Sequence, residues 1–352
     1  MAIESTARLA SVAISSQKNV LATRIADGVY SQLNGGGPGC SVEDRQKSER
    51  DIGFHLNYLA DALWAEDAAL FTDYVSWVNV LFANLKMSPT VLPITLNVTR
   101  KVLADALPAQ LAGVSDEYLI LGLVEANQAD TTVPSFLDER APLTGLAAEY
   151  MNLLLQGQRH AAVQLILDAV RQGTSITSIY LDVFQRTQQE IGRLWQLNQI
   201  SVAQEHYCTA VTQFTMSQLY PYIFTSVRKD RRMVATSVGG ELHEIGIRMV
   251  ADFFELHGWD TYYLGANAPT EAVVQAVAEN GADLLAISAT LTPHVQKVAE
   301  LVEAVRTMKR PPKVMVGGYP FNISHTLWRT VRADGTAADA AAAVTVGERL
   351  VG

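Results

Sequence analysis

The alternation of short apolar runs and helical stretches after residue 230 constrains the fold more than any other feature of the chain. The apolar runs cover residues 233–238, 261–264, 284–288 and 313–316, with a weaker fifth run at 331–333, and the helical stretches cover 243–257, 270–280, 293–308 and 339–350. Alternation of this kind predicts parallel strands joined by helical crossovers. We therefore expect residues 229–352 to form a flavodoxin-like (Rossmann-type) α/β domain with ligands at the carboxyl ends of its strands.

The first 228 residues show helical periodicity and no alternating strand pattern. Helices fit residues 6–33, 41–64, 67–86, 89–107, 115–129 and 134–139. After a break near 138–142, four more helices fit residues 144–156, 158–172, 175–196 and 200–226. Pro221 should kink or end the last of these helices. The last four helices suit a compact bundle. The expected organisation is an all-α domain at 1–140, a four-helix bundle at 141–228 and the α/β domain at 229–352.

Composition and charge narrow the functional classes. The net charge of −9, with no basic arm, argues against a nucleic-acid binder, because phosphate neutralisation requires clustered Lys and Arg. Two distant cysteines, Cys40 and Cys208, form no disulfide framework and favour a cytoplasmic location. The N-terminus lacks the features of a secretory signal, and no apolar run approaches the ~20 residues of a membrane helix.

Residues suited to ligand chemistry follow each of the first four predicted strands. His243 follows the first, Gly265 the second, Ser288 to Thr290 close the third, and Gly317-Gly318 follow the fourth. An imidazole here could reach a metal, glycines let a bulky group approach the backbone, and hydroxyls could bind a nucleotide tail. The alternative is that His243 caps a helix and the glycines only form turns.

Three elements in this order resemble the cobalamin-binding domain shared by methionine synthases, corrinoid proteins and cobalamin photoreceptors. They are Glu241-x-His243-x-x-Gly246, Ser288-x-Thr290 and Gly317-Gly318. The resemblance implies that His243 replaces dimethylbenzimidazole below cobalt and that the displaced tail lies beside Ser288 and the glycine pair. It also implies that Glu241 fixes the imidazole tautomer and Gly246 permits close packing. The family more often has Asp at the position of Glu241 and Leu at that of Thr290. His257 suits a helix C-terminus, and His294 suits only the wall of the site.

Trp195, followed after nine residues by Glu205-His206, resembles the upper-face motif of CarH-type adenosylcobalamin photoreceptors. The resemblance implies that these three residues enclose the adenosyl group, and that light breaks the cobalt–carbon bond, releases adenosine and moves the bundle. Gln196 stands where those photoreceptors have the histidine that binds cobalt after photolysis, so water or His206 would have to cap the metal. Without the neighbouring domain, Trp195 would be assigned to the core and Glu205-His206 to a solvated helix face.

The N-terminal helices carry many aromatic residues and His55, and the domain order resembles the photocobilins, which combine cobalamin with biliverdin. The resemblance implies a biliverdin near His55, with Arg45, Lys47, Arg50 or Arg100 pairing with its propionates. Most of these aromatics also suit a helical core. Cys40 could attach a bilin, and a haem-binding globin with His55 on iron is a further alternative.

Two functions from different classes follow. The first is a non-enzymatic light sensor that binds adenosylcobalamin and biliverdin, and whose output is light-dependent self-association or contact with a signalling protein. The alternative is a corrinoid carrier for a methyltransferase system, which needs an open upper face. An adenosylcobalamin mutase is disfavoured, because no substrate barrel accompanies the domain.

Overall fold

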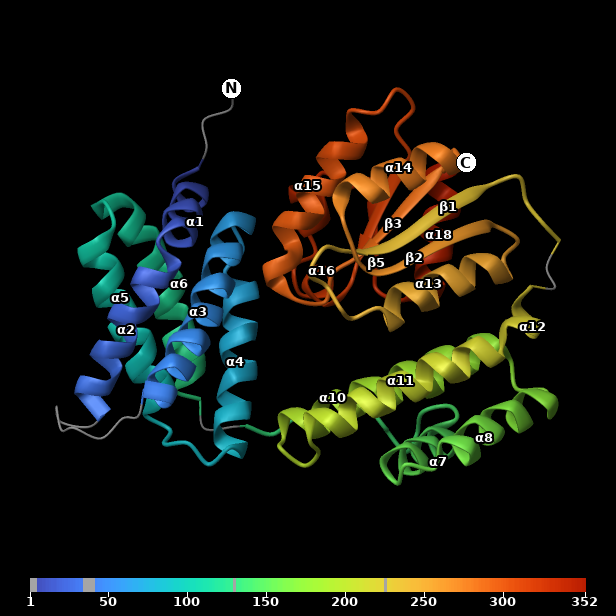
Figure 1. Ribbon diagram of the computed structural model, residues 1–352, viewed down its shortest axis with the longest axis horizontal. Helices are drawn as coiled ribbons and strands as arrows, with labels where there is room; N and C mark the ends of the chain where they lie inside the picture. Colours follow the sequence, from blue (N-terminus) through green and yellow to red (C-terminus); the bar gives the residue numbers. More distant parts are fainter. Residues whose placement is uncertain (1–4, 34–41, 129–130, 225–226) are drawn as a thin grey trace. The chain divides into compact units, whose positions relative to one another are not determined.

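The computed structural model describes residues 5–33, 42–128, 131–224 and 227–352. The chain divides into two compact units, Met1–Thr132 and Val133–Gly352 (Figure 1). In the described ranges, no helix is both long enough and apolar enough to cross a membrane.

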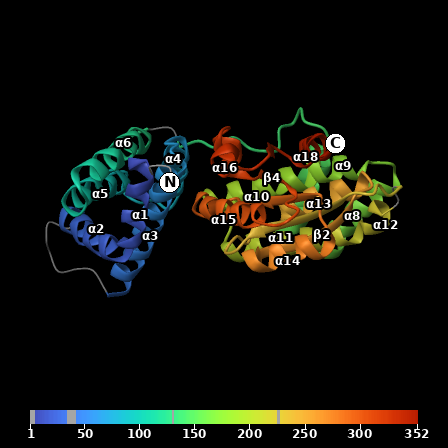
Figure 2. The ribbon, with the colours of Figure 1, turned by 90° about the horizontal axis from the view of Figure 1, so that it is seen from above.

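The first unit is all helical (Figures 1 and 2). Its elements are α1 (Thr6–Ser16), α2 (Lys18–Leu33), α3 (Val42–Ala65), α4 (Ala69–Asn84), α5 (Val91–Ala106) and α6 (Ala109–Ala126). The single helix predicted over 6–33 is interrupted at Gln17, where the backbone leaves the helical region and the amide bonds back to Ile14. The core is mainly aliphatic, and it includes Ile14, Ile25, Leu56 and the ring of Phe71.

The second unit begins with an extended segment. The prediction of a short helix over 134–139 is wrong, because residues 131–135 have no regular structure. The segment instead forms hydrogen bonds with the bundle. The Phe136 amide donates to Glu190 Oε2 at 2.9 Å, and Arg193 donates to the Val133 carbonyl at 3.2 Å. Pro134 also disfavours helical geometry at the residue before it.

The predicted bundle follows this segment. Its elements are α7 (Thr144–Leu155), α8 (Arg159–Arg171), α9 (Ile176–Ser178), the π-helical turn η1 (Ile179–Gln185), α10 (Arg186–Gln196), α11 (Val202–Gln218) and α12 (Tyr220–Ile223). Ser201 and Gln204 form a capping box that begins α11. As expected, the helix does not continue through Pro221, which lies in the first turn of α12.

The α/β domain confirms the predicted fold class. Five parallel strands are ordered β2-β1-β3-β4-β5. They are β1 (Arg232–Val238), β2 (Asp260–Ala268), β3 (Leu284–Ser288), β4 (Lys313–Gly317) and β5 (Gly335–Ala337). The crossover helices contact each other in two pairs: α13 (Ile245–Leu256) with α18 (Ala340–Val351), and α14 (Thr270–Asn280) with α15 (Val295–Arg306). Because β1 lies between β2 and β3, the chain reverses its direction of winding at the carboxyl end of β1.

The fifth strand lies later in the sequence than expected. Residues 331–333 follow the short helix α17 (Leu327–Thr330), and Arg332 has a left-handed backbone with φ of 59°. The prediction at 331–333 is therefore wrong. Gly335 begins the true strand, where a Cβ would come within 3.0 Å of the Val346 side chain on α18.

Candidate functional site

The loop between β1 and α13 presents His243 at the carboxyl end of the sheet. The first residue after β1, Gly239, is followed by Gly240, which turns the chain with φ of 87°. Helix α13 begins at Ile245, two residues later than predicted, so His243 belongs to the loop rather than to the helix. Its side chain is 57% exposed.

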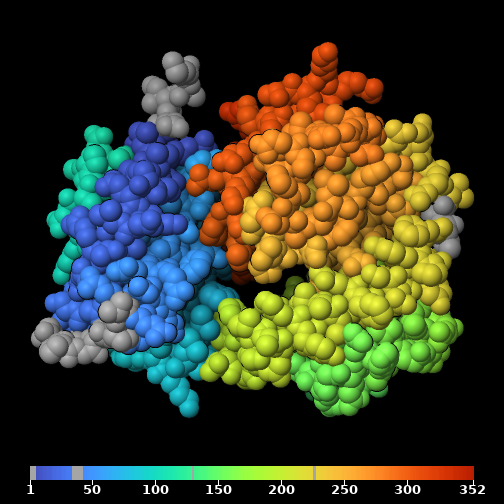
Figure 3. Space-filling model, viewed as in Figure 1, coloured from blue at the N-terminus to red at the C-terminus, as the bar shows by residue number. Residues whose placement is uncertain are grey.

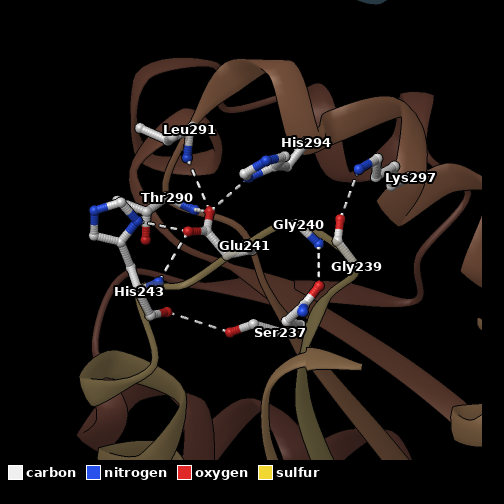
Figure 4. Close-up of polar contacts among 10 residues, drawn as sticks. Ser237, Gly239, Gly240, Glu241, His243, Thr290, Leu291, His294 and Lys297 are labelled. Atoms are coloured by element: carbon white, nitrogen blue, oxygen red, sulfur yellow. Dashed lines mark hydrogen bonds and ion pairs between the residues drawn. The ribbon is translucent and has the colours of Figure 1, made fainter. Parts of the chain in front are cut away.

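Glu241 is fully buried beneath this loop and accepts hydrogen bonds from five groups (Figure 4). Its Oε1 accepts from His243 Nδ1 at 2.5 Å and from the His243 amide at 3.0 Å. Its Oε2 accepts from the amides of Thr290 and Leu291 at 2.7 and 3.2 Å, and from His294 Nδ1 at 2.9 Å. A buried carboxylate with this many donors remains ionised.

The electrostatics of the pair favour a basic imidazole at His243. Burial alone would raise the pKa of Glu241, but hydrogen bonds from His243, His294 and the backbone hold it far below its ordinary value. The hydrogen bond to Glu241 in turn raises the pKa of His243 against the opposing effect of burial. Because Nδ1 is bonded to Glu241, Nε2 is the nitrogen that can coordinate a metal.

His294 has a larger role than the wall position expected for it. It precedes α15 at the end of the short 3₁₀ turn η2 (Thr292–His294), and its side chain bonds to the same carboxylate as His243. The sequence holds a helix-start signal at Thr292-Pro293, but nothing in it shows that the imidazole turns back toward Glu241.

The remaining predicted residues of the domain lie around this carboxyl end. Ser288 pairs in register with Gly317 at the ends of β3 and β4. Gly318 has φ of 106°, and a Cβ there would overlap the Ala289 carbonyl oxygen, so the position requires glycine. Thr290 contributes its amide to Glu241. At Gly246 a Cβ would meet no atom of the chain within 4 Å, so the space beside it is open.

Helices α10 and α11 bring the predicted upper-face residues toward the same site. Trp195 is partly buried near the end of α10, and Gln196 beside it is buried. Glu205 lies in the first turn of α11, where its Oε2 is 2.5 Å from His206 Nδ1 and its Oε1 accepts from Thr209 at 3.0 Å. The charge of Glu205 also helps to raise the pKa of His243, so the two residues lie within electrostatic range.

The bundle is bonded to the α/β domain next to the His243 loop. Gln213 of α11 donates to Glu244 Oε1 at 2.6 Å, and Arg248 of α13 donates to Ser217 at 2.7 Å. A hollow lies between the surface of α10 and α11 and that of the α/β domain (Figure 3).

The residues present fit a cobalt macrocycle. Among the described residues, no group of three or more His, Cys, Asp or Glu side chains is placed to hold a bare metal ion. A cobalt macrocycle would bring most of its own ligands to the metal, so a single imidazole from the chain would be sufficient. His243 offers Nε2 at a largely exposed side chain, and the space at Gly246 beside it is open.

His55 belongs to a separate aromatic cluster in the first unit. Its Nδ1 lies 2.8 Å from the Tyr74 hydroxyl, and the ring of Tyr58 stacks on Tyr74 at 3.7 Å. Burial lowers the pKa of His55 to about 4, so the imidazole is neutral near pH 7. The proposed propionate partner Arg100 forms a two-point ion pair with Asp116. Cys40 lies outside the described residues.

Comparisons with known proteins agree with this site. Residues 231–345 match a family model described as a B12 binding domain, and residues 146–220 match a second model of the same description. These matches, with the fold and the His243 loop, make the chain a cobalamin-binding protein.

More particularly, the chain is similar to corrinoid proteins over part of its length. A corrinoid protein of Desulfitobacterium hafniense is 23% identical over 217 residues, which are 60% of this chain and 99% of that protein. Dimethylamine corrinoid protein 1 of Methanosarcina mazei is 31% identical over 98 residues, 27% of this chain and 45% of that protein. The structure of the Methanosarcina barkeri monomethylamine corrinoid protein shares the fold, with a TM-score of 0.52 and 22% identity over 59% of this chain and 99% of that one.

Proposed function

We propose that this chain is a corrinoid carrier that holds cobalamin with its own base displaced and with His243 as the lower ligand. The observation that carries the proposal is the Glu241–His243 pair, in which a buried, ionised carboxylate bonds Nδ1 and leaves Nε2 available. The relatives that match 217 and 98 residues of the chain are corrinoid proteins, and that similarity supports a carrier. A bound methylcobalamin supplies a cobalt–methyl bond for transfer.

In this proposal, each residue of the candidate site has a defined role. His243 coordinates cobalt, and Glu241 fixes its tautomer and raises its basicity. Ser288 and the turn at Gly317-Gly318 line the space for the displaced tail. Helices α10 and α11 would lie over the bound group, and the chain itself would turn over no substrate; a partner methyltransferase would have to reach the group from that side.

A light-responsive sensor is the second candidate function, and two observations favour it. Trp195 lies near the end of α10 and Glu205 in the first turn of α11, the helix whose Gln213 bonds to Glu244 next to His243, and this arrangement suits a pocket for an upper adenosyl group. In addition, the match to the Desulfitobacterium protein takes up 99% of that protein but only 60% of this chain, so this chain has residues that find no counterpart in that relative. In the sensor, the cluster of His55, Tyr58 and Tyr74 is the candidate site for biliverdin, and the output is self-association or a signalling partner.

Two measurements separate the carrier from the sensor: the effect of light on the elution volume, and the transfer of methyl from bound methylcobalamin to a methyltransferase. The protein is loaded with adenosylcobalamin, and its elution volume on size exclusion is compared before and after illumination, with and without biliverdin. Alkylcobalamins are themselves sensitive to light, so the elution volume, not the cobalamin spectrum, is the discriminating readout. A carrier elutes at the same position in both states and loses methyl from methylcobalamin to a methyltransferase partner. A light-dependent shift, or a red absorption band with biliverdin, contradicts the simple carrier and supports the sensor.

A further inference from the structure

The carboxyl end of β2 is irregular beside the His243 loop. Ala235 pairs with Tyr263, Thr236 with Gly265 and Val238 with Ala268, so β2 advances five residues while β1 advances three. The extra residues form two bulges, and Gly265 and Asn267 take left-handed backbones with φ of 79° and 56°. Bulges re-aim side chains and are common next to functional sites.

The bulged segment contacts the loop on both sides of His243. Asn267 Oδ1 accepts from the Gly240 amide at 2.7 Å, and the Asn267 amide donates to the Glu241 carbonyl at 2.9 Å. On the other side, the Ala266 amide donates to Glu244 Oε2 at 3.2 Å. His243 therefore lies between two points of attachment to the end of β2.

The residue type at 267 suits this task. Asparagine tolerates the left-handed region better than other non-glycine residues, and its amide oxygen can accept a bond from a neighbouring loop. Asn267 is exposed, so burial does not require a residue of this kind. The two bonds of Asn267 reach Gly240 and Glu241, the residues that set the direction in which the loop carries its imidazole.

We infer that Asn267 is a positioning residue for the lower ligand: from the bulged end of β2, it holds the Gly240–Glu241 backbone so that His243 is set toward the cobalt of a bound corrinoid. The inference rests on the proposed ligation of cobalt by His243. A loop without this brace has more conformations in which His243 faces away from the metal, and ligation then weakens.

The experiment compares three variants. Asn267→Gly keeps the left-handed backbone and the amide bond to Glu241 but loses the Oδ1 acceptor, whereas Asn267→Asp keeps an acceptor at the same place. Asn198→Gly is the matched control, because Asn198 also has a left-handed backbone, with φ of 55°, but lies in the turn between α10 and α11. Each full-length protein is labelled with ¹⁵N-histidine and loaded with cob(II)alamin.

Paramagnetic resonance and the Kd for cobalamin are the readouts. A histidine ¹⁵N on cobalt splits the lines into pairs, the natural base would split them into threes, and water gives no such splitting. Asn267→Gly should raise the Kd roughly threefold to tenfold, the factor expected for one net hydrogen bond. Asn267→Asp and Asn198→Gly should resemble the wild type in Kd and in the paired lines, and equal melting temperatures would show that all variants are folded.

The results separate the inference from the proposed function. A wild-type Kd in Asn267→Gly, or an equal loss in Asn267→Asp or Asn198→Gly, overturns the positioning role and leaves His243 ligation intact. Absence of the paired lines in the wild type overturns ligation by His243, and the positioning role with it.

Discussion

At the scale of single residues, one buried carboxylate organises the site. Glu241 accepts from two imidazoles and three backbone amides that come from the β1–α13 loop and from the segment after β3. The Glu-x-His spacing makes the contact with His243 predictable from the sequence. The contacts of His294 with Glu241 and of Asn267 with Gly240 are not predictable in this way, because the partners lie 53 and 27 positions apart, respectively.

Glu241→Gln should weaken cobalamin binding about tenfold to a hundredfold, the usual effect of removing a carboxylate behind a metal-bound histidine. The neutral amide makes the imidazole less basic and presents N–H groups to donors. Titration of each apo-protein with cobalamin gives the Kd. Glu271→Gln, in the first turn of α14, is the matched control and should bind like the wild type. Equal affinity of Glu241→Gln and the wild type would contradict the role assigned to Glu241.

At the scale of elements, the sequence pattern predicts the order and type of nearly every helix and strand. The regular alternation after residue 230 suffices for β1, β3 and β4 because these strands are short, buried and apolar. It fails at β5 and for the bulges of β2, where register depends on contacts made in the folded sheet. The interrupted first helix is also missed, since apolar spacing continues across Gln17.

A substitution at Gly318 measures how much the close packing of the turn after β4 contributes to stability. Gly318→Ala should lower the free energy of unfolding by roughly 2–4 kcal/mol, because it combines left-handed strain with overlap on the Ala289 carbonyl. Gly157→Ala shares the strain, with φ of 73°, but meets no atom within 4 Å and should cost only about 1 kcal/mol. Urea unfolding measures both. Equal losses would show that the crowding at Gly318 is relieved by movement of its neighbour.

The contact between the bundle and α13 should depend on pH. Burial raises the pKa of Asp252, which accepts from Tyr180 at 2.7 Å, to about 6. Because the folded pKa is raised, the stabilising contribution is complete below the unfolded value of about 3.9 and is lost as the pH rises through 6. Asp252→Asn should therefore gain stability relative to the wild type between pH 5 and 7.5, by about 1–3 kcal/mol. Urea unfolding at both pH values measures the gain, and a constant difference would contradict the pKa.

At the scale of the whole molecule, the proposed cobalamin site belongs to one of the two compact units. The Glu241 network, the turn at Gly318 and the residues of α10 and α11 all lie within Val133–Gly352. The first unit is a helical domain with its own core and its own histidine cluster. A cytoplasmic location and the identity of any partner stay predictions.

A fragment of residues 133–352 should fold alone and bind cobalamin with a Kd within about twofold of the full chain, because the proposed ligand contacts lie inside it. Calorimetry on both proteins makes the comparison. A large loss of affinity in a fragment that retains its helical and sheet content would show that the first unit contributes directly to binding.

In the proposed complex, helix α11 would connect the two faces of the cofactor. Glu205, which is assigned to the proposed upper face, and Gln213, which bonds to the residue after His243, lie two turns apart on one continuous helix. Because the helix is continuous, a displacement of its first turn would be transmitted through Gln213 and Glu244 to the loop that carries His243. If a corrinoid is bound as proposed, linkage would require the reverse as well: a change that strengthens the bond between the metal and His243 would also change how strongly a ligand is held on the opposite face.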